Sequence, residues 1–258
     1  MGRAMALLYG VICYAVFLLT FLYAIAFVAD VGVPYTIDQG RDGIMSTALI
    51  VNLILLGIFA VQHTGMARRG FKRWLTGWMP EPMERSTYVL LSSLALILLF
   101  WQWRPITAVI WNVETSWAFW LLYAISAFGW LLVLTGTFVI NHFDLFGLRQ
   151  VWLHARGHAY TEVELKDSLY YRLIRHPLML GFIIAFWATP QMTVGHLLFA
   201  VATTGYIVLA VKFFEEPDLV SMHGEAYRDY QRKVPMLCPW PRARHANGAT
   251  PAPTPTEP

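Results

Sequence analysis

The chain has 258 residues, of which 57% are hydrophobic and only 14% are charged. Soluble domains carry about 25% charged residues, so this composition excludes most soluble folds and indicates a membrane protein. The net charge of +3 and the two cysteines, Cys13 and Cys238, give no basis for a nucleic-acid partner, a disulfide framework or a zinc site.

The apolar segments follow one another along the chain and predict its fold class. A hydrocarbon core of ~30 Å takes about 20 helical residues to cross, and four runs meet that length. A fifth region, 177–214, has a short first arm, 177–188, and a full-length second arm, 193–214. We therefore predict an all-α polytopic membrane bundle of five to six transmembrane helices with a C-terminal helical hairpin. The four long runs are 6–29, 44–62, 86–103 and 117–140.

The same segments predict three parts of the chain. Residues 1–140 hold the first four membrane helices, and residues 141–240 hold a cytosolic loop, the hairpin and a C-terminal segment. Residues 241–258 end in the stretch ANGATPAPTPTEP, which is rich in Ala, Pro and Thr and carries one charge. Such a tail cannot bury enough apolar surface to offset the entropy of ordering it, so we expect it to be disordered.

The basic residues predict the orientation of the bundle. Of the 19 lysines and arginines, only Arg41 and Arg104 fall on one side of a six-crossing arrangement, which holds the loops 30–43 and 104–116 and the turn 189–193. Because lysine and arginine collect in cytoplasmic loops, both termini and the polar loops 63–85 and 141–176 are expected to face the cytoplasm. Any site built by these loops therefore faces cytosolic cofactors.

A first polar cluster lies at the end of the second helix and the start of the third. His63 and Arg68 belong to the stretch QHTGMAR, and Glu84 and Arg85 open the next helix. Polar groups at membrane ends are often functional, but they also serve as simple interfacial anchors. The sequence leaves both interpretations open.

A second cluster, NHFD, follows the fourth helix directly. It places Asn141, His142 and Asp144 within four residues. These groups are costly to bury at a membrane end unless they bond to each other or to a ligand, and one helical turn would bring Asn141 and Asp144 onto one face. A polar helix cap is the alternative interpretation.

A third cluster, HARGH, invites a metal interpretation that we reject. His154 and His158 are spaced to bind one metal from a helix face. Histidine-box oxygenases need further paired histidines, whereas the other histidines here stand singly. Gly157 also weakens the helix that would align the pair. We predict surface histidines in a loop and no metal site.

A fourth cluster joins the two ends of the hairpin. Arg175, His176 and Pro177 precede its first arm, and Glu215 and Glu216 follow its second arm. A short return through the bilayer brings the acidic pair back to the basic residues. The unpaired N–H groups at the start of the first arm suit a carboxylate, and the acidic pair suits ribose hydroxyls or an ammonium. The hairpin ends thus predict a cradle for a zwitterionic nucleoside.

At these residues the chain resembles the isoprenylcysteine carboxyl methyltransferase and phospholipid methyltransferase group. Met179 stands where that group usually has tyrosine. The resemblance implies that Leu178, Gly181, Tyr227 and Arg228 join the cofactor site. The matching stretches are RHPLMLGF from Arg175, EEPDL from Glu215 and HGEAYRDY from His223.

Further motifs narrow the resemblance to the methanethiol S-methyltransferases, membrane enzymes that make dimethyl sulfide. The related nitrite- and nitric-oxide-associated membrane family shares the general plan. The narrower motifs are QHTGMAR from Gln62, ERSTY from Glu84, WQWRP from Trp101 and HFDLFGLRQ from His142.

This resemblance implies methyl transfer from S-adenosyl-L-methionine to a small volatile thiol in a bacterial inner membrane. Because the thiolate attacks, the site needs a base or a cationic setting. We predict His142 as the base with Asp144 as its orienting partner, and His63, Arg68, Glu84 and Arg85 as alternatives. Competing hypotheses are an isoprenylcysteine or phospholipid methyltransferase, a histidine-ligated metal oxidoreductase and a non-enzymatic membrane protein.

Overall fold

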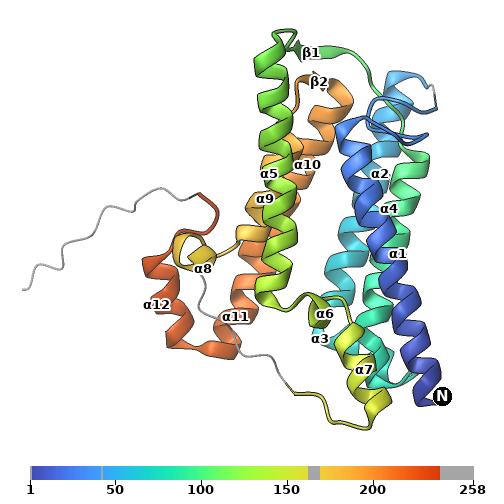
Figure 1. Ribbon diagram of the computed structural model, residues 1–258, viewed down its shortest axis with the longest axis vertical. Coiled ribbons are helices and arrows are strands. Elements are labelled where there is room, and N and C mark those ends of the chain that lie inside the picture. Colours follow the sequence, from blue (N-terminus) through green and yellow to red (C-terminus); the bar gives the residue numbers. More distant parts are fainter. Residues whose placement is uncertain (1, 42, 162–168, 239–258) are drawn as a thin grey trace, which may run out of the picture.

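The computed structural model describes residues 2–41, 43–161 and 169–238 (Figure 1). Within these residues, five helices are long and apolar enough to cross a membrane. The predicted all-α membrane bundle is therefore confirmed. The predicted disordered tail, 241–258, lies outside the described residues. The long helices are α1 (Arg3–Ala29), α2 (Met45–Ala67), α4 (Glu84–Gln102), α5 (Ser116–Ile140) and α10 (Val194–Ala210).

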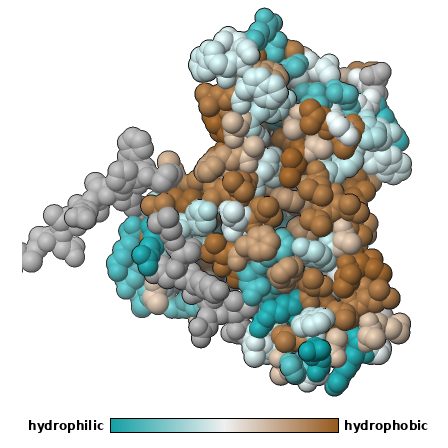
Figure 2. Space-filling model, viewed as in Figure 1, coloured by the Kyte–Doolittle hydropathy of each residue, from teal (hydrophilic) through white to brown (hydrophobic). Residues whose placement is uncertain are grey.

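Most of the shorter elements lie toward the two ends of the bundle, whereas α9 packs beside α5 within it (Figure 1). In Figure 2, hydrophobic side chains cover the middle of the visible face and hydrophilic ones lie mainly toward its ends. The short helices are α3 (Arg69–Thr76), α6 (His142–Leu145), α7 (Leu148–Arg156), α8 (Leu169–Leu173), α9 (Pro177–Trp187), α11 (Glu216–His223) and α12 (Glu225–Lys233). A 3₁₀ turn (Glu81–Met83), a π-helix (Val211–Glu215) and the strands β1 (Val109–Asn112) and β2 (Gln191–Thr193) complete the described elements.

The C-terminal hairpin forms as predicted. Its first arm, α9, has 11 residues, about 16 Å of helix at 1.5 Å per residue, which is too short to cross the hydrocarbon core. The strands β1 and β2, which the sequence analysis did not predict, pair antiparallel and join the hairpin turn to the α4–α5 connection. The helices α3, α6, α7, α11 and α12 lie at the opposite end, together with the start of α1 (Figure 1).

Two glycines let α5 and α9 approach closely. A Cβ atom on Gly129 would lie 2.7 Å from the backbone nitrogen of Ala185 and from the carbonyl oxygen of Gly181. A Cβ atom on Gly181 would lie 2.8 Å from the carbonyl oxygen of Gly129. Small residues at such a contact are the usual means of helix packing in membranes. The α5–α9 contact therefore fixes the first arm of the hairpin.

Gly129→Ala is expected to destabilise the bundle by about 1–3 kcal/mol, because an added methyl group in a packed contact forces the helices apart. Gly205→Ala on α10 is the matched control, since a Cβ atom there meets nothing within 4 Å. The thermal unfolding midpoints of both variants in the same detergent test this. Equal midpoints would show that the close approach contributes nothing.

A partly buried carboxylate lies at the end of the bundle that holds β1 and β2. The Asp38 carboxylate accepts a hydrogen bond of 2.5 Å from the Thr193 hydroxyl at the start of α10. Burial, and to a smaller extent the charge of Asp30, raise the pKa of Asp38 to about 6, against the effect of the Thr193 bond. The loop between α1 and α2 is thus fastened to the hairpin by a carboxyl group that resists ionisation.

Asp38→Asn is expected to raise the unfolding midpoint above pH 6 and to leave it nearly unchanged near pH 4. The folded protein holds the Asp38 proton up to a pKa of about 6, whereas the unfolded chain releases it near the ordinary aspartate pKa of 3.8. Stability therefore falls as pH rises through that window, and the amide removes this loss. Thermal unfolding from pH 4 to pH 8 measures it. A midpoint difference that is independent of pH would contradict it.

Candidate functional site

A buried ion pair connects the two ends of the hairpin. The Arg175 Nε atom donates to Glu216 Oε1 at 2.7 Å, and Arg175 Nη2 lies 2.5 Å from the same oxygen. The two side chains are only 5% and 12% exposed. Gln231 on α12 donates to Glu216 Oε2 at 3.1 Å. The predicted return of the acidic pair to the basic residues is therefore present in the structure.

His176 lies between the two glutamates. Its Nε2 atom is 3.3 Å from Glu216 Oε1, and its Nδ1 atom is 3.4 Å from Glu215 Oε1. A protonated imidazole would donate to both carboxylates. Glu215 is 44% exposed, so its carboxylate has room to accept hydrogen bonds from a ligand, whereas Glu216 is occupied by protein groups.

The segment after α12 is clamped onto the start of α9. The backbone N–H groups of Arg175 and His176 donate to the carbonyl oxygens of Pro235 and Met236 at 2.9 and 3.1 Å. Arg175 Nη1 also donates to the carbonyl oxygens of Gln231 and Val234 at 3.0 and 2.5 Å. These bonds use most of the donors of the guanidinium. Arg175 therefore holds the shape of the site, and the groups left to contact a ligand lie beside it.

A π-helix places the acidic pair. Between α10 and α11 the backbone widens to a π-helix over Val211–Glu215, and α11 begins at Glu216 with Pro217 in its first turn. π-Helical turns rotate the residues that follow and occur often at functional sites. Here the turn ends at Glu215, so the two carboxylates leave the helix where His176 lies. A sequence pattern that predicts a continuous α-helix here does not predict this rotation.

Tyr227 supplies an unpaired polar atom at the same place. Its side chain is buried, and its hydroxyl oxygen has no hydrogen-bond partner among the described residues. Burial, followed by the charge of Glu216, raises the pKa of Tyr227. Burial likewise raises the pKa of Tyr171, on α8, to about 12. A neutral, buried hydroxyl beside Glu215 can bond to a ribose or amino-acid group, so these residues fit a zwitterionic nucleoside.

Four other residues predicted for the cofactor site have structural contacts of their own. Gly181 contacts α5, and Leu178 packs on Gly136 of the same helix, 3.5 Å from where its Cβ atom would lie. Arg228 is exposed and pairs with Glu225 one turn away. Pro177 is buried at the first position of α9. Each of these residues therefore has a packing or ion-pair contact within the protein. Their part in cofactor binding stays a prediction.

A second set of contacts ties α2 to α11. Arg68 Nη1 lies 3.5 Å from Asp218 Oδ2, and the guanidinium stacks over the Phe214 ring at 4.7 Å. Arg69 donates to the Ser221 hydroxyl at 3.1 Å. The buried Nε atom of Arg68 has no hydrogen-bond partner in the structure. The first predicted cluster therefore lies next to the acidic end of the hairpin.

His63 lies one turn further into α2, among hydroxyl groups. Its Nε2 atom is 2.9 Å from the Tyr88 hydroxyl, and its Nδ1 atom is 3.3 Å from the Ser92 hydroxyl. The ring stacks on Phe59 at 5.1 Å. The charge of Arg85 acts on both His63 and Tyr88. The structure thus brings together His63, Arg85 and two hydroxyl groups that sequence reasoning did not select.

Arg85 also lines a polar pocket of about 470 Å³ at the same end of the bundle. Its Nε atom donates to the carbonyl oxygen of Leu145 at 3.0 Å, which joins α4 to the loop after α5. The other charged side chains around this pocket are Lys72, Glu81, Glu84 and Asp144. Burial lowers the pKa of Lys72. Glu84 and Arg85, two of the predicted alternatives to His142, therefore share one pocket with Asp144.

The predicted pairing of His142 with Asp144 is wrong. His142 Nδ1 is 2.8 Å from the Thr137 hydroxyl, and Nε2 is 2.8 Å from the Tyr14 hydroxyl. Asp144 instead contacts Arg149 at 2.9 Å and the Tyr160 hydroxyl at 3.2 Å. A separation of two residues puts both groups at the same helix end, but each side chain bonds to a different set of neighbours. Asn141 caps the turn, accepting from the Asp144 N–H at 3.2 Å, as the alternative interpretation expected.

The bonds of His142 also fix its tautomer. The Thr137 hydroxyl donates to the carbonyl oxygen of Leu134 at 2.6 Å, so it accepts from Nδ1–H of His142. The Nε2 lone pair is then engaged by the Tyr14 hydroxyl. The ring stacks on Phe138 at 4.4 Å, and burial lowers its pKa. His142 is neutral and enclosed, and any proton transfer to it would pass through Tyr14.

The two histidines of the third cluster do not share a helix face. The helix α7 ends at Arg156, and Gly157 adopts a left-handed conformation with φ of 75°. His154 and His158 nevertheless both line the polar pocket beside Asp144, which the sequence analysis did not expect. Among the described residues, no group of three metal-ligating side chains comes together.

The residues missed by sequence reasoning are mostly tyrosines within the helices. Tyr14, Tyr88 and Tyr206 each bond a polar side chain on another helix. In a chain with 12 tyrosines, the residue type alone does not single these out. The two histidines are the sequence signal that could have pointed to these tyrosines. His63 and His142 lie in or directly after a membrane helix, where a polar side chain needs a hydrogen-bond partner.

The chain is similar to proteins of known name over most of its length. The family described as NnrU protein matches residues 49–222. The methanethiol S-methyltransferase of Mycobacterium tuberculosis is 56% identical over 245 residues, which cover 95% of this chain and 100% of that protein. The methanethiol S-methyltransferase of Crocosphaera subtropica is 51% identical, with 93% and 94% coverage. Nurim from Rattus norvegicus is 30% identical, with 74% and 75% coverage.

No solved structure matches this chain.

Proposed function

The chain belongs to the methanethiol S-methyltransferase family and to the NnrU protein family, and from this premise we propose that it methylates methanethiol with S-adenosylmethionine, forming dimethyl sulfide. The chain is a thiol S-methyltransferase of the membrane. The single structural observation that carries the finer proposal is the cluster of Arg175, His176, Glu215 and Glu216 at the ends of the hairpin.

This cluster supports a site for the methyl donor. S-adenosylmethionine, when bound, supplies an electrophilic methyl group on its sulfonium. We assign Glu215 to receive its hydroxyl or ammonium groups, because that carboxylate is partly exposed and pairs with His176 on one side. The unpaired Tyr227 hydroxyl is a second contact. Arg175 and Glu216 position these groups through the C-terminal clamp, in the part of the chain, 141–240, expected to carry the cofactor.

The thiol needs a proton acceptor and a cationic setting, and His63 with Arg85 offers both. The thiol proton would move to a ring nitrogen of His63, which Tyr88 and Ser92 orient. The positive charge of Arg85 favours the thiolate. A bond then forms between the thiolate sulfur and the methyl carbon as the sulfonium bond breaks, leaving S-adenosylhomocysteine. His142, the base predicted from sequence, stays the alternative base, since hydroxyl groups face both of its ring nitrogens as they do at His63.

We also infer that this end of the bundle faces the cytoplasm of a bacterial cell, where the methyl donor is made. The concentration of lysine and arginine in the loops at this end supports the orientation. A fluorescent protein fused to the C-terminus should fold and fluoresce if this orientation holds. A fusion active only as a periplasmic reporter would overturn it.

The function is tested with purified protein, methanethiol and methyl-labelled S-adenosylmethionine. Dimethyl sulfide in the headspace and S-adenosylhomocysteine in solution are expected in equal amounts. Parallel reactions with an isoprenylated cysteine and with phosphatidylethanolamine distinguish the lipid methyltransferases. Turnover of either lipid with none of methanethiol would overturn the proposed substrate.

A further inference from the structure

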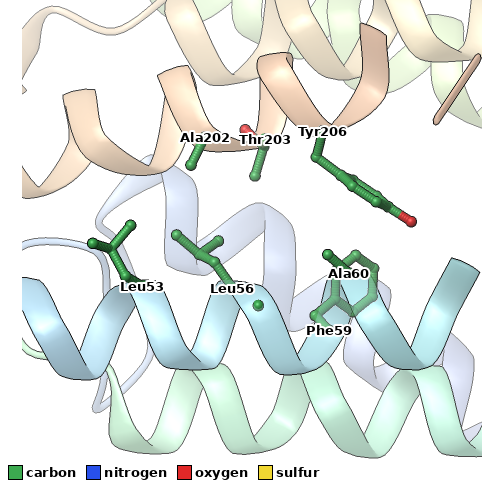
Figure 3. Close-up of a pocket in the computed structure, with 8 residues that line it drawn as sticks. Leu53, Leu56, Phe59, Ala60, Ala202, Thr203 and Tyr206 are labelled. Atoms are coloured by element: carbon green, nitrogen blue, oxygen red, sulfur yellow. The ribbon is translucent and has the colours of Figure 1, made fainter. Parts of the chain in front are cut away.

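A groove opens between the middle of α2 and α10. It has a volume of about 230 Å³ and is lined by Leu56, Gly57 and Phe59 of α2 and by Ala202, Thr203 and Tyr206 of α10, among others. In Figure 3 the labelled side chains of the two helices face each other across it. Both helices are candidate membrane spans, so the groove lies at the depth of the hydrocarbon. A molecule dissolved in the bilayer can reach it without crossing water.

The lining of the groove offers a ligand almost no polar atom. The Thr203 hydroxyl donates to the carbonyl oxygen of Phe199 in its own helix at 2.6 Å. The Tyr206 hydroxyl is bonded to the Thr64 hydroxyl at 2.9 Å. The volume is below the roughly 300–1,000 Å³ of pockets for drug-sized ligands. The groove therefore suits a small apolar molecule and is poorly suited to a lipid headgroup.

The inner end of the groove touches the proposed thiol site. Phe59, a lining residue, stacks on the His63 ring at 5.1 Å. Tyr206, on the opposite wall, is 6.2 Å from Phe59 between ring centroids and bonds to Thr64, the residue after His63. The Tyr88 hydroxyl bonds to His63 Nε2 at 2.9 Å. Phe59 and Tyr206 thus separate the groove from His63 and Tyr88.

We propose that the groove between α2 and α10 admits methanethiol from the lipid phase, and that Phe59 and Tyr206 form the inner gate to His63. This proposal rests on the proposed function. It divides the substrates by their chemistry: the charged methyl donor is held at the water-facing hairpin ends, and the apolar thiol arrives through the helices. The gate would also limit the thiol by size, because two aromatic rings border its passage.

Filling the groove tests the proposal, and two glycines provide a matched pair. Gly57 lines the groove and Gly205 does not, and a Cβ atom on either residue meets nothing within 4 Å. Gly57→Leu is expected to raise KM for methanethiol about tenfold, equivalent to about 1.4 kcal/mol of binding. The Kd for S-adenosylmethionine, measured by calorimetry, should stay unchanged. Gly205→Leu should match the wild type in both values.

The outcomes separate this proposal from the proposed function. Suppose that the wild type makes dimethyl sulfide, but KM is unchanged in Gly57→Leu or rises equally in Gly205→Leu. That result overturns only the proposal that the groove admits methanethiol. A wild-type enzyme that makes no dimethyl sulfide overturns the proposed function and the groove with it. If Gly57→Leu does not fold, Ala202→Leu fills the groove from the α10 side, and the same rise in KM is required.

Discussion

Glu216→Gln is expected to weaken S-adenosylmethionine binding at least about a hundredfold and to lower the unfolding free energy by about 3 kcal/mol. The substitution keeps the size of the side chain but leaves the guanidinium of Arg175, which is 5% exposed, without its counter-charge. The clamp of Arg175 on the C-terminal segment and the position of His176 depend on the same carboxylate. Calorimetry with the methyl donor and thermal unfolding in detergent measure the two effects.

Glu225→Gln is the matched control for that result. Glu225 lies on α12 and pairs with Arg228 and Arg232 at the surface, where its side chain is 69% exposed. Surface pairs contribute only about 0–1 kcal/mol, so both cofactor binding and stability should stay near the wild type. If Glu216→Gln bound the methyl donor as tightly as Glu225→Gln does, the hairpin ends would not form the donor site.

The hairpin and the approach of its two ends could be predicted from the lengths of its two apolar arms. A short arm of 11 residues followed by a full-length helix must return the chain to the end from which it started. That constraint alone brings Glu216 to Arg175, although the two are 41 residues apart. What length could not supply is the rotation of the helix at the π-turn, which decides that Glu216 is buried and Glu215 is partly exposed.

The second polar cluster could not be resolved from sequence because its partners are distant. His142 bonds to Tyr14, 128 residues earlier, and Asp144 bonds to Tyr160 on the far side of α7. The spacing of residues along the chain shows which side chains lie at the same helix end. Their hydrogen-bond partners depend on which other helix packs beside that end. The same limit applies to His63, whose neighbours Tyr88 and Ser92 come from α4.

His63→Gln is expected to lower turnover about 10²–10⁴-fold while the affinity for S-adenosylmethionine stays unchanged, because the variant loses a general base and leaves the hairpin ends untouched. His142→Gln is the comparison, since that ring is enclosed by Tyr14, Thr137 and Phe138, and its substitution should affect stability more than turnover.

If His63 takes the thiol proton, raising the pH should restore turnover of His63→Gln by about tenfold per unit, because more thiolate forms in solution. A purely structural role would give a loss independent of pH. Turnover of both variants, measured from pH 7 to pH 10, tests this, and a pH-dependent loss in His142→Gln alone would assign the base to His142 instead.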